Sequence, residues 1–150
     1  MRYVSYLRDG APGVGIVQDG DVVPLEGIAS IGDGVGATEL SAAAMVESDS
    51  FPLAEAHLLA ASPRRSKVFC VGLNYLDHVG ETKRDLPTYP VMFPKYASSL
   101  IGADDPIPIP PESTQVDYEG ELAVVIGTAG RRIREEDALG HVLGFAVATM

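Results

Sequence analysis

The 150-residue sequence lacks cysteine pairs and long apolar runs, and each absence excludes a class of protein. Cys70 is the single cysteine, so no internal disulfide can form, and we expect a reducing compartment, the cytoplasm. The longest aliphatic run, Leu122 to Ile126, is far shorter than the roughly 20 residues that cross a bilayer. No basic segment followed by an apolar stretch opens the chain, so we expect no secretory signal.

Positive charge is also scarce. Eleven Lys and Arg residues stand against 21 Asp and Glu residues, which gives a net charge of −10. The basic pairs Lys83-Arg84 and Arg131-Arg132 are short and have no aromatic residues between them. The chain therefore has no positively charged surface that would attract nucleic acid or an anionic membrane, and neither is an expected partner. A hydrophobic content of 46% excludes a disordered chain and indicates a globular protein.

The first third of the chain has the pattern of a small antiparallel sheet. Residues Arg2 to Leu7, Val14 to Val17 and Val22 to Val23 have strand composition. Asp9-Gly10 and Asp19-Gly20 separate these runs, and Asp-Gly is a strong hairpin signal. The pattern predicts an antiparallel meander.

Two helices are expected after the meander. Thr38 can cap the first, which runs through Leu40 to Val46, and the second covers Leu53 to Ala61. The segment Ser62 to Ser66 contains a proline and is the expected boundary between modules. We therefore predict a small N-terminal domain over residues 1–62 and a second domain over residues 63–150.

The second domain opens with a predicted strand and a short helix that carries a candidate dyad. Lys67 to Val71 is apolar enough for a buried strand, and Asn74 can cap a helix over Tyr75 to Glu81. His78 and Glu81 stand three positions apart and so share one helix face. A carboxylate beside an imidazole can orient it for proton transfer from water. A solvated surface pair is the alternative interpretation.

A second candidate site lies at the start of a predicted strand. Glu119 and Glu121 flank Gly120 and precede the apolar run Leu122 to Ile126, which is typical of a strand buried on both sides. Side chains two positions apart on a strand point the same way, about 7 Å apart. Two such carboxylates favour a hard divalent ion, Mg²⁺, Mn²⁺ or Ca²⁺. The alternative is that the strand start is exposed and both carboxylates are hydrated.

The remaining stretches predict an extended edge, a helix and a final strand. Asp104 to Pro111 alternates proline with isoleucine, which suits an extended edge, and Arg134 to His141 has acidic residues in its first turn, as a helix favours. Val142 to Met150 has the composition of a buried strand. Because the chain stops inside this element, we expect it to be truncated.

Several ordered motifs of the sequence resemble the fumarylacetoacetate hydrolase family. The N-terminal meander resembles the small N-terminal domain of many bacterial members. The matching segments are Val71 to His78, Glu81, Phe93 to Lys95, Asp117 to Gly127, Glu135 to Leu139 and Gly144 to Val147.

The resemblance implies an α+β fold rich in strands. The expected architecture is the family's mixed β-sandwich roll, incomplete here, preceded by the small antiparallel domain and assembled as a homodimer. It further implies that Glu119 and Glu121 ligate Mg²⁺ or Mn²⁺ and that His78 and Glu81 activate water. Lys95 would contact substrate.

The resemblance also implies a substrate class. The expected reaction is metal-dependent hydrolysis of a C–C bond in a β-diketo or 2-oxo acid, such as an acylpyruvate or a fumarylacetoacetate-like compound. Because the same metal enolate serves other chemistry, a decarboxylase or isomerase of oxaloacetate or of aromatic-catabolism intermediates is the alternative. The family's third metal ligand is an aspartate, and an ungapped count places Met150 at that position. An inactive truncated remnant that acts only in assembly is therefore a hypothesis from another class.

Overall fold

A computed structural model describes residues 1–32, 35–63, 67–82 and 85–149, and of His78 and Thr82 it describes the backbone alone. The chain forms two compact units. One comprises Met1–Arg64 and Ile101–Met150, and the other comprises Arg65–Leu100. Among the described residues, every helix is too short or too polar to cross a bilayer.

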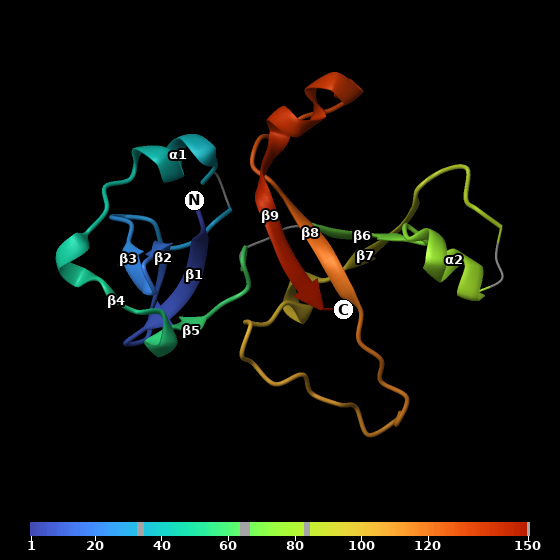
Figure 1. Cartoon of the computed structure of the whole chain (residues 1–150), viewed down its shortest axis with the longest axis horizontal. Helices are drawn as coiled ribbons and strands as arrows, with labels where there is room; N and C mark the ends of the chain where they lie inside the picture. The colour runs from blue at the N-terminus through green and yellow to red at the C-terminus, as the bar shows by residue number, and fades with distance from the viewer. Residues whose placement is uncertain (33–34, 64–66, 83–84, 150) are drawn as a thin grey trace. The chain divides into compact units, whose positions relative to one another are not determined.

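A five-stranded antiparallel sheet organises the N-terminal part of the first unit (Figure 1). The strand order is β4-β3-β2-β1-β5, so the predicted meander β1-β2-β3 occupies its centre. The strands are β1 (Tyr3–Arg8), β2 (Ala11–Gln18), β3 (Asp21–Pro24), β4 (Phe51–Pro52) and β5 (His57–Leu58).

The two hairpin turns have the conformation that their sequences predict. Asp9 and Gly10 have φ angles of 51° and 78°, and Asp19 and Gly20 have φ angles of 49° and 94°. Positive φ at both central residues defines the type I′ turn, whose twist matches that of the flanking strands. The register follows, with Arg8 opposite Ala11 in the first hairpin. The predicted meander is confirmed.

The segments after the meander differ from the predicted helices. The helix α1 (Ala37–Ala42) begins after Gly36, two residues before the expected cap at Thr38. Two single-turn 3-10 helices follow, η1 (Glu47–Asp49) and η2 (Leu53–Glu55). The predicted helix over Leu53 to Ala61 is wrong, because His57 and Leu58 form β5 and pair with β1. Pairing at a sheet edge satisfies backbone groups that a short isolated helix cannot hold stably.

Both faces of the sheet are covered by apolar side chains. On one face Tyr6 packs edge-on against Phe51, with ring centroids 5.2 Å apart. The other face contacts two partly buried residues from the C-terminal part of the same unit, Val125 and Leu143. The buried residues of this second cluster are Val14, Ile16, Leu25, Ile31 and Leu40.

The C-terminal part of the first unit is an antiparallel ribbon of two strands. Strand β8 (Gly120–Ile126) pairs with β9 (Val142–Thr149), and the 3-10 helix η4 (Glu135–His141) lies between them in sequence. Exposure alternates along β8, so one face is half-buried and the other is exposed. The prediction that this run is buried on both sides is wrong for the described chain, because no described residue covers the second face. Residues 104–111, predicted as an extended edge, join no sheet.

The second unit combines a strand pair with a helix. Strand β6 (Val68–Gly72) pairs with β7 (Val91–Lys95), and α2 (Leu76–Thr82) lies between them in sequence. A 3-10 helix, η3 (Ala97–Ser99), follows β7. The predicted strand at Lys67 to Val71 is therefore confirmed, but its burial is not, because Phe69 is 58% exposed.

Candidate functional site

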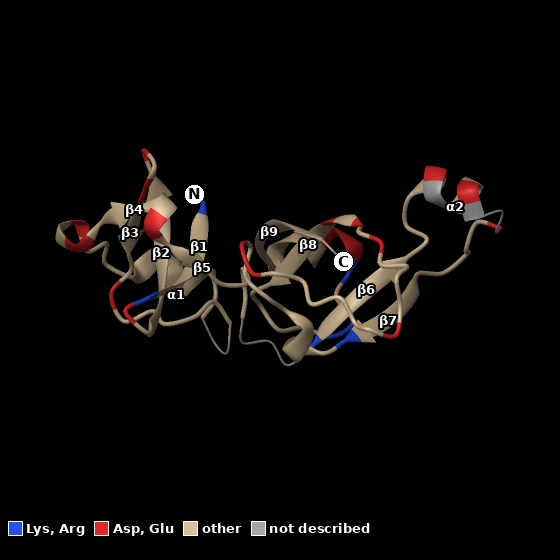
Figure 2. Ribbon diagram, turned by 90° about the horizontal axis from the view of Figure 1, so that it is seen from below, with Lys and Arg blue, Asp and Glu red and all other residues tan. Residues whose placement is uncertain are grey.

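The proposed dyad residues lie on one short helix. His78 and Glu81 both fall within α2, three positions apart, as the sequence predicts. Val79, only 4% exposed, anchors the helix between them, while Glu81 is exposed. Asp77 is also acidic, so acidic positions recur along this helix (red in Figure 2). The side chain of His78 lies outside the described residues.

Lys95 is the last residue of β7. It stands opposite Val68 in the register of the β6-β7 pair and is half-buried. The antiparallel pairing fixes its backbone, so the position of the side chain is limited to one face of the strand. This places a positive charge in the same unit as the α2 dyad.

The two candidate metal ligands lie at the start of β8, in the other unit. Glu121 belongs to the strand and is half-buried, whereas Glu119 precedes the first strand residue and is exposed. The sequence predicted both glutamates at a strand start, and the structure places them there. Gly120 between them has open space where a Cβ would lie, within the described chain.

Small side chains surround the face of the ribbon that carries Glu121. Ala148 stands directly opposite Glu121, and Ala146 stands opposite Ala123. Directly opposed residues in an antiparallel pair project to the same face. Leu122 and Val147 fall on the other face, whereas Val125 lies on the face of Glu121 and packs against the N-terminal cluster. The neighbours of Glu121 on this face are therefore the small side chains of Ala123, Ala146 and Ala148.

The donor chemistry of this face suits a hard divalent ion. Carboxylate oxygens are the ligands that Mg²⁺, Mn²⁺ and Ca²⁺ prefer, and zinc sites more often use His and Cys. Among the described residues, however, no group of three or more acidic, His or Cys side chains could hold a metal ion. Met150, where the count from the family places the third ligand, lies outside the described residues. The structure thus supplies two of the expected donors.

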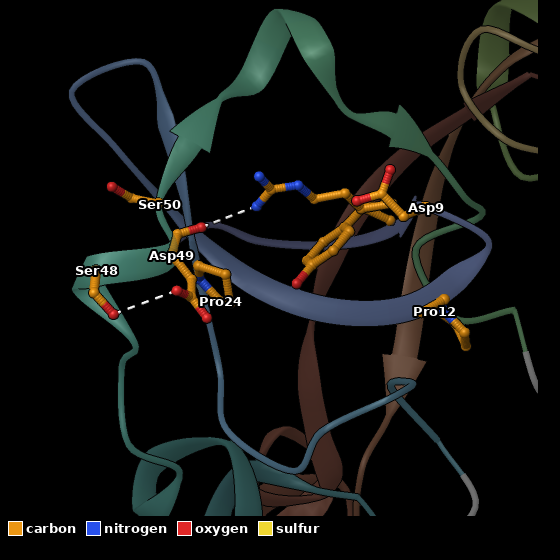
Figure 3. Close-up of a pocket in the computed structure, with 9 residues that line it drawn as sticks. Asp9, Pro12, Pro24, Ser48, Asp49 and Ser50 are labelled. Carbon is orange, nitrogen blue, oxygen red and sulfur yellow. Dashed lines mark hydrogen bonds between the residues drawn. The ribbon is translucent and has the colours of Figure 1, made fainter.

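A cavity in the N-terminal sheet contains none of the predicted site residues (Figure 3). Its wall includes Tyr6 and Arg8, and the Arg8 guanidinium donates a hydrogen bond of 3.1 Å to the carbonyl oxygen of Asp49. Burial raises the pKa of the Tyr6 hydroxyl, although nearby Arg8 acts in the opposite direction. The Arg8 guanidinium also lies 4.3 Å from the Phe51 ring centroid, so its contacts stabilise the sheet.

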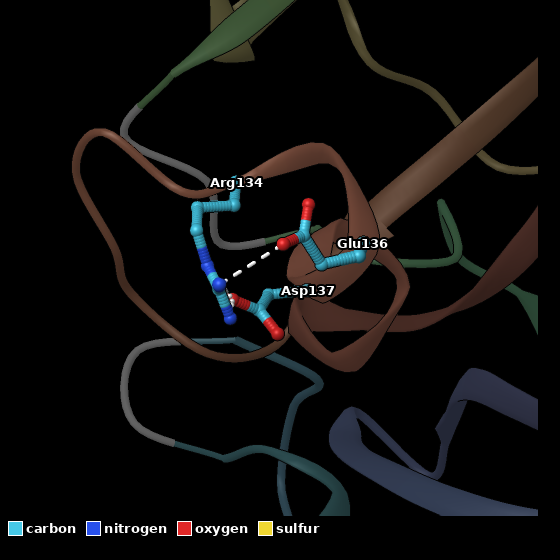
Figure 4. Close-up of polar contacts among 3 residues, drawn as sticks. All are labelled: Arg134, Glu136 and Asp137. Carbon is cyan, nitrogen blue, oxygen red and sulfur yellow. Dashed lines mark hydrogen bonds and ion pairs between the residues drawn. The ribbon is translucent and has the colours of Figure 1, made fainter.

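A second polar cluster lies at the start of η4 (Figure 4). Arg134 forms ion pairs with Glu136 at 3.0 Å and with Asp137 at 2.8 Å. All three side chains are more than half exposed, and such pairs contribute little to stability. The cluster lies in the connection between β8 and β9 and includes none of the predicted site residues.

Two family descriptions match the chain. Residues 67–149 match the fumarylacetoacetate (FAA) hydrolase C-terminal family, and residues 1–60 match the family described as Rv2993c-like, N-terminal. The first match alone covers more than half of the chain. The chain belongs to the fumarylacetoacetate hydrolase family. The predicted family, with its small N-terminal domain, is confirmed, and all five candidate site residues fall within the first match.

Individual relatives of the fumarylacetoacetate hydrolase family support the same assignment. Oxaloacetate tautomerase fahd2, mitochondrial, from Xenopus laevis is 50% identical over 91 residues, which are 61% of this chain and 28% of that protein. Fumarylacetoacetate hydrolase from psychrophilic Exiguobacterium antarcticum superposes with a TM-score of 0.68 at 30% identity. The superposition covers 98% of this chain and 54% of that one.

A further solved structure is 5-carboxymethyl-2-hydroxymuconate delta-isomerase from Mycobacterium smegmatis. It has a TM-score of 0.74 at 28% identity and covers 99% of this chain and 54% of that chain. The chain thus spans about half the length of these solved structures and less than a third of the Xenopus relative. The strand-rich fold expected for the family is confirmed over this part.

Proposed function

We propose that this chain belongs to an enzyme that interconverts the keto and enol forms of a 2-oxo dicarboxylic acid. The observation that carries the proposal is the pair Glu119 and Glu121 at the start of β8, where the residues nearest to Glu121 on its face are alanines. The 50% identity to a protein named oxaloacetate tautomerase supports the reaction type, as does the likeness to a muconate isomerase.

Glu119 and Glu121 would hold a divalent ion, Mg²⁺ or Mn²⁺, with Ca²⁺ as another hard cation of suitable chemistry. Such an ion, when bound, supplies Lewis-acid stabilisation to the enolate form of the substrate. The two carboxylates would be its anionic ligands and would neutralise part of its charge, which would keep a bound 2-oxo acid exchangeable.

His78 and Glu81 would move the proton. In tautomerisation the base removes a proton from the carbon beside the keto group and a proton is delivered to the keto oxygen, so atoms balance without a co-reactant. A histidine can do both near neutral pH because its ordinary pKa is about 6.5. The Glu81 carboxylate three positions away on α2 suits the role of orienting the imidazole.

Lys95 would contact a substrate carboxylate. The substrate class is dianionic and the chain carries a net charge of −10, so binding requires local positive charge. Lys95, half-buried at the end of β7, is suited to that role.

Hydrolysis of a C–C bond is the second candidate reaction. It is the reaction that the name of the Exiguobacterium relative describes. In this variant the His78–Glu81 pair would direct water at the distal carbonyl of an acylpyruvate instead of transferring a proton to carbon. Decarboxylation of oxaloacetate would use the same residues. For the assembly we propose a homodimer, which rests on the family resemblance, and for the location the cytoplasm, which rests on the single cysteine.

A calorimetric titration with Mn²⁺ tests the metal site. We expect the chain to bind Mn²⁺ weakly, and Glu119→Gln/Glu121→Gln to lose at least roughly tenfold in affinity, because both hard anionic donors are removed. Glu112→Gln/Glu135→Gln is the matched control, since it changes the net charge equally at two exposed positions outside β8.

Equal affinities in the glutamate variant and the control would remove the metal assignment. Binding of Mn²⁺ without any turnover of oxaloacetate enol or acylpyruvate by the chain would favour the hypothesis of an inactive remnant. Turnover of one substrate and not the other would decide between tautomerase and hydrolase.

A further inference from the structure

A set of contacts joins β5 of the N-terminal sheet to the segment that leads toward Glu119. The Gly102 backbone N–H donates a hydrogen bond of 2.7 Å to Oδ2 of Asp105. The other carboxylate oxygen of Asp105, Oδ1, lies 3.5 Å from Nε2 of His57. Both oxygens of one carboxylate are therefore engaged, one by its own loop and one by β5. His57 and Asp105 are 54% and 31% exposed.

Gly102 brings this loop unusually close to β5. A Cβ added at Gly102 would collide with the backbone carbonyl oxygen of Leu58 and would lie 2.9 Å from Oδ2 of Asp105. The residue is buried, and its φ angle does not require glycine. Glycine is therefore required at position 102 because any side chain would prevent the close contact with the backbone of Leu58. We call His57, Gly102 and Asp105 the β5 latch.

A second attachment lies just after the glutamates. Val125 and Leu143 pack against the buried cluster of the N-terminal sheet. The carbonyl oxygen of Gly127 lies 3.1 Å from the position that a Cβ of Gly36 would take. The N-terminal module thus holds this part of the chain at residues 102–105 and again at residues 125–127. Residues 106–119 between the two attachments form neither helix nor strand.

We propose that the N-terminal module braces the strand start that carries Glu119 and Glu121, with His57, Gly102 and Asp105 as positioning residues. This inference rests on the proposed metal site. The packing at Val125 fixes β8 beyond the glutamates, and the latch fixes the loop before them. Opening the latch lengthens the free segment before Glu119 and increases the number of conformations that metal binding must restrict, which lowers affinity.

Two variants open the latch by different means. Asp105→Asn removes the charge that faces His57, and Gly102→Ala introduces the collision with Leu58. We expect amide hydrogen exchange at Gly102 and over β8 (Gly120–Ile126), where the amides are hydrogen-bonded, to accelerate roughly two- to fivefold in Asp105→Asn, the factor that a partly exposed polar contact supports. In Gly102→Ala we expect exchange to accelerate roughly tenfold or more, because the added methyl group would displace the loop from the backbone of Leu58. Mn²⁺ affinity in calorimetry should fall by similar factors.

Matched controls separate positioning from general destabilisation. Asp104→Asn makes the same change at the neighbouring exposed residue, and Gly140→Ala adds a Cβ where no described atom lies within 4 Å. Both should leave exchange and affinity unchanged. His57→Ala should behave as Asp105→Asn does, and His57→Lys should restore both readouts because the lysine ammonium can donate to Oδ1 of Asp105.

Unchanged exchange at Gly102 and over β8 in both latch variants would overturn the proposal. Accelerated exchange with unaltered Mn²⁺ affinity would also overturn it, because the loop would then be held without serving the site. If the unsubstituted chain binds no Mn²⁺, the proposed metal site fails, and exchange alone decides whether the latch holds the loop.

Discussion

Glu119 and Glu121 experience different surroundings although they are only two positions apart. Glu119 is exposed and can relax into water, whereas Glu121 is half-buried on the face that also carries Ala148. A half-buried side chain has fewer conformations to lose on binding a ligand than an exposed one. At this residue scale Glu121 is therefore the better-positioned member of the proposed pair of ligands.

The role of His78 is tested by substitution with alanine. We expect His78→Ala to lower kcat for oxaloacetate tautomerisation by roughly a hundredfold or more, because a positioned general base contributes about that factor. The assay follows the loss of enol absorbance with Mn²⁺ present.

Asp77→Ala, at the adjacent residue of α2, is the control and should retain most of the activity. Mn²⁺ affinity should be the same in both variants, since neither residue is a proposed ligand. A His78→Ala enzyme with an unaltered rate would reject the proton-transfer role.

At the scale of the element, α1 shows how one carboxylate sets the start of a helix. Gly36 precedes the helix and has no side chain to cap it, but its backbone N–H donates a hydrogen bond of 2.8 Å to Oε2 of Glu39. This bond lowers the pKa of the Glu39 carboxyl. The helix therefore begins at Ala37 instead of after Thr38, the cap that the sequence suggested.

The lowered pKa of Glu39 predicts a pH-dependent stability. A carboxyl with a depressed folded-state pKa stabilises the fold above its unfolded value of about 4.3, and this contribution is lost as the pH falls through the folded pKa. We expect Glu39→Gln to have a lower Tm than the unsubstituted chain near pH 7, and the difference to vanish toward about pH 3.

Thermal unfolding at several pH values measures this difference. Glu55→Gln changes the net charge equally on another single-turn element, η2, and serves as the control. A difference for Glu39→Gln that stays constant between pH 7 and pH 3 would contradict the role of its charge.

The sequence predicts an element correctly where the interactions that determine its structure are between residues close together in the chain. The Asp-Gly hairpins and the α2 helix were predicted correctly, because their geometry is set within a few residues. The segment 53–61 was predicted as helix and forms η2 and β5, because pairing with β1, about fifty residues away, decides its structure. For the same reason sequence spacing gave no sign of the contact between His57 and Asp105.

At the scale of the whole molecule, the five proposed site residues divide between the two units. The α2 dyad and Lys95 belong to one unit, and the two glutamates belong to the other. The family motifs single out each of these residues as a candidate, since the motifs are short and ordered along the chain. They could not show which side chains lie together, because that depends on packing between distant segments. The apolar run at 122–126 is wrongly predicted to be buried on both faces for a similar reason. Apolar composition indicates that a strand is stabilised by burial, but it does not identify the segment that packs on each face.

The exposed face of the β8-β9 ribbon has a consequence for solution behaviour. Leu122 and Val147 are 59% and 89% exposed and stand directly opposite each other. Val124, Ile126 and Phe145 extend the same apolar face. Contiguous apolar patches of this kind on a ribbon with unpaired edges favour association between chains.

We therefore expect the chain to self-associate, and Leu122→Lys/Val147→Lys to shift it toward monomer in sedimentation velocity, because two charges would have to be desolvated at the contact. Leu139→Lys is the control for an apolar-to-lysine change, since Leu139 is 77% exposed on η4 and lies outside the ribbon face. If all three proteins sediment alike, association does not use this face. If only the double variant becomes monomeric and it keeps its Mn²⁺ affinity, then the face with Leu122 and Val147 mediates association and the face with Glu121 binds the ion. The two roles can be separated because side chains alternate between the two faces along β8.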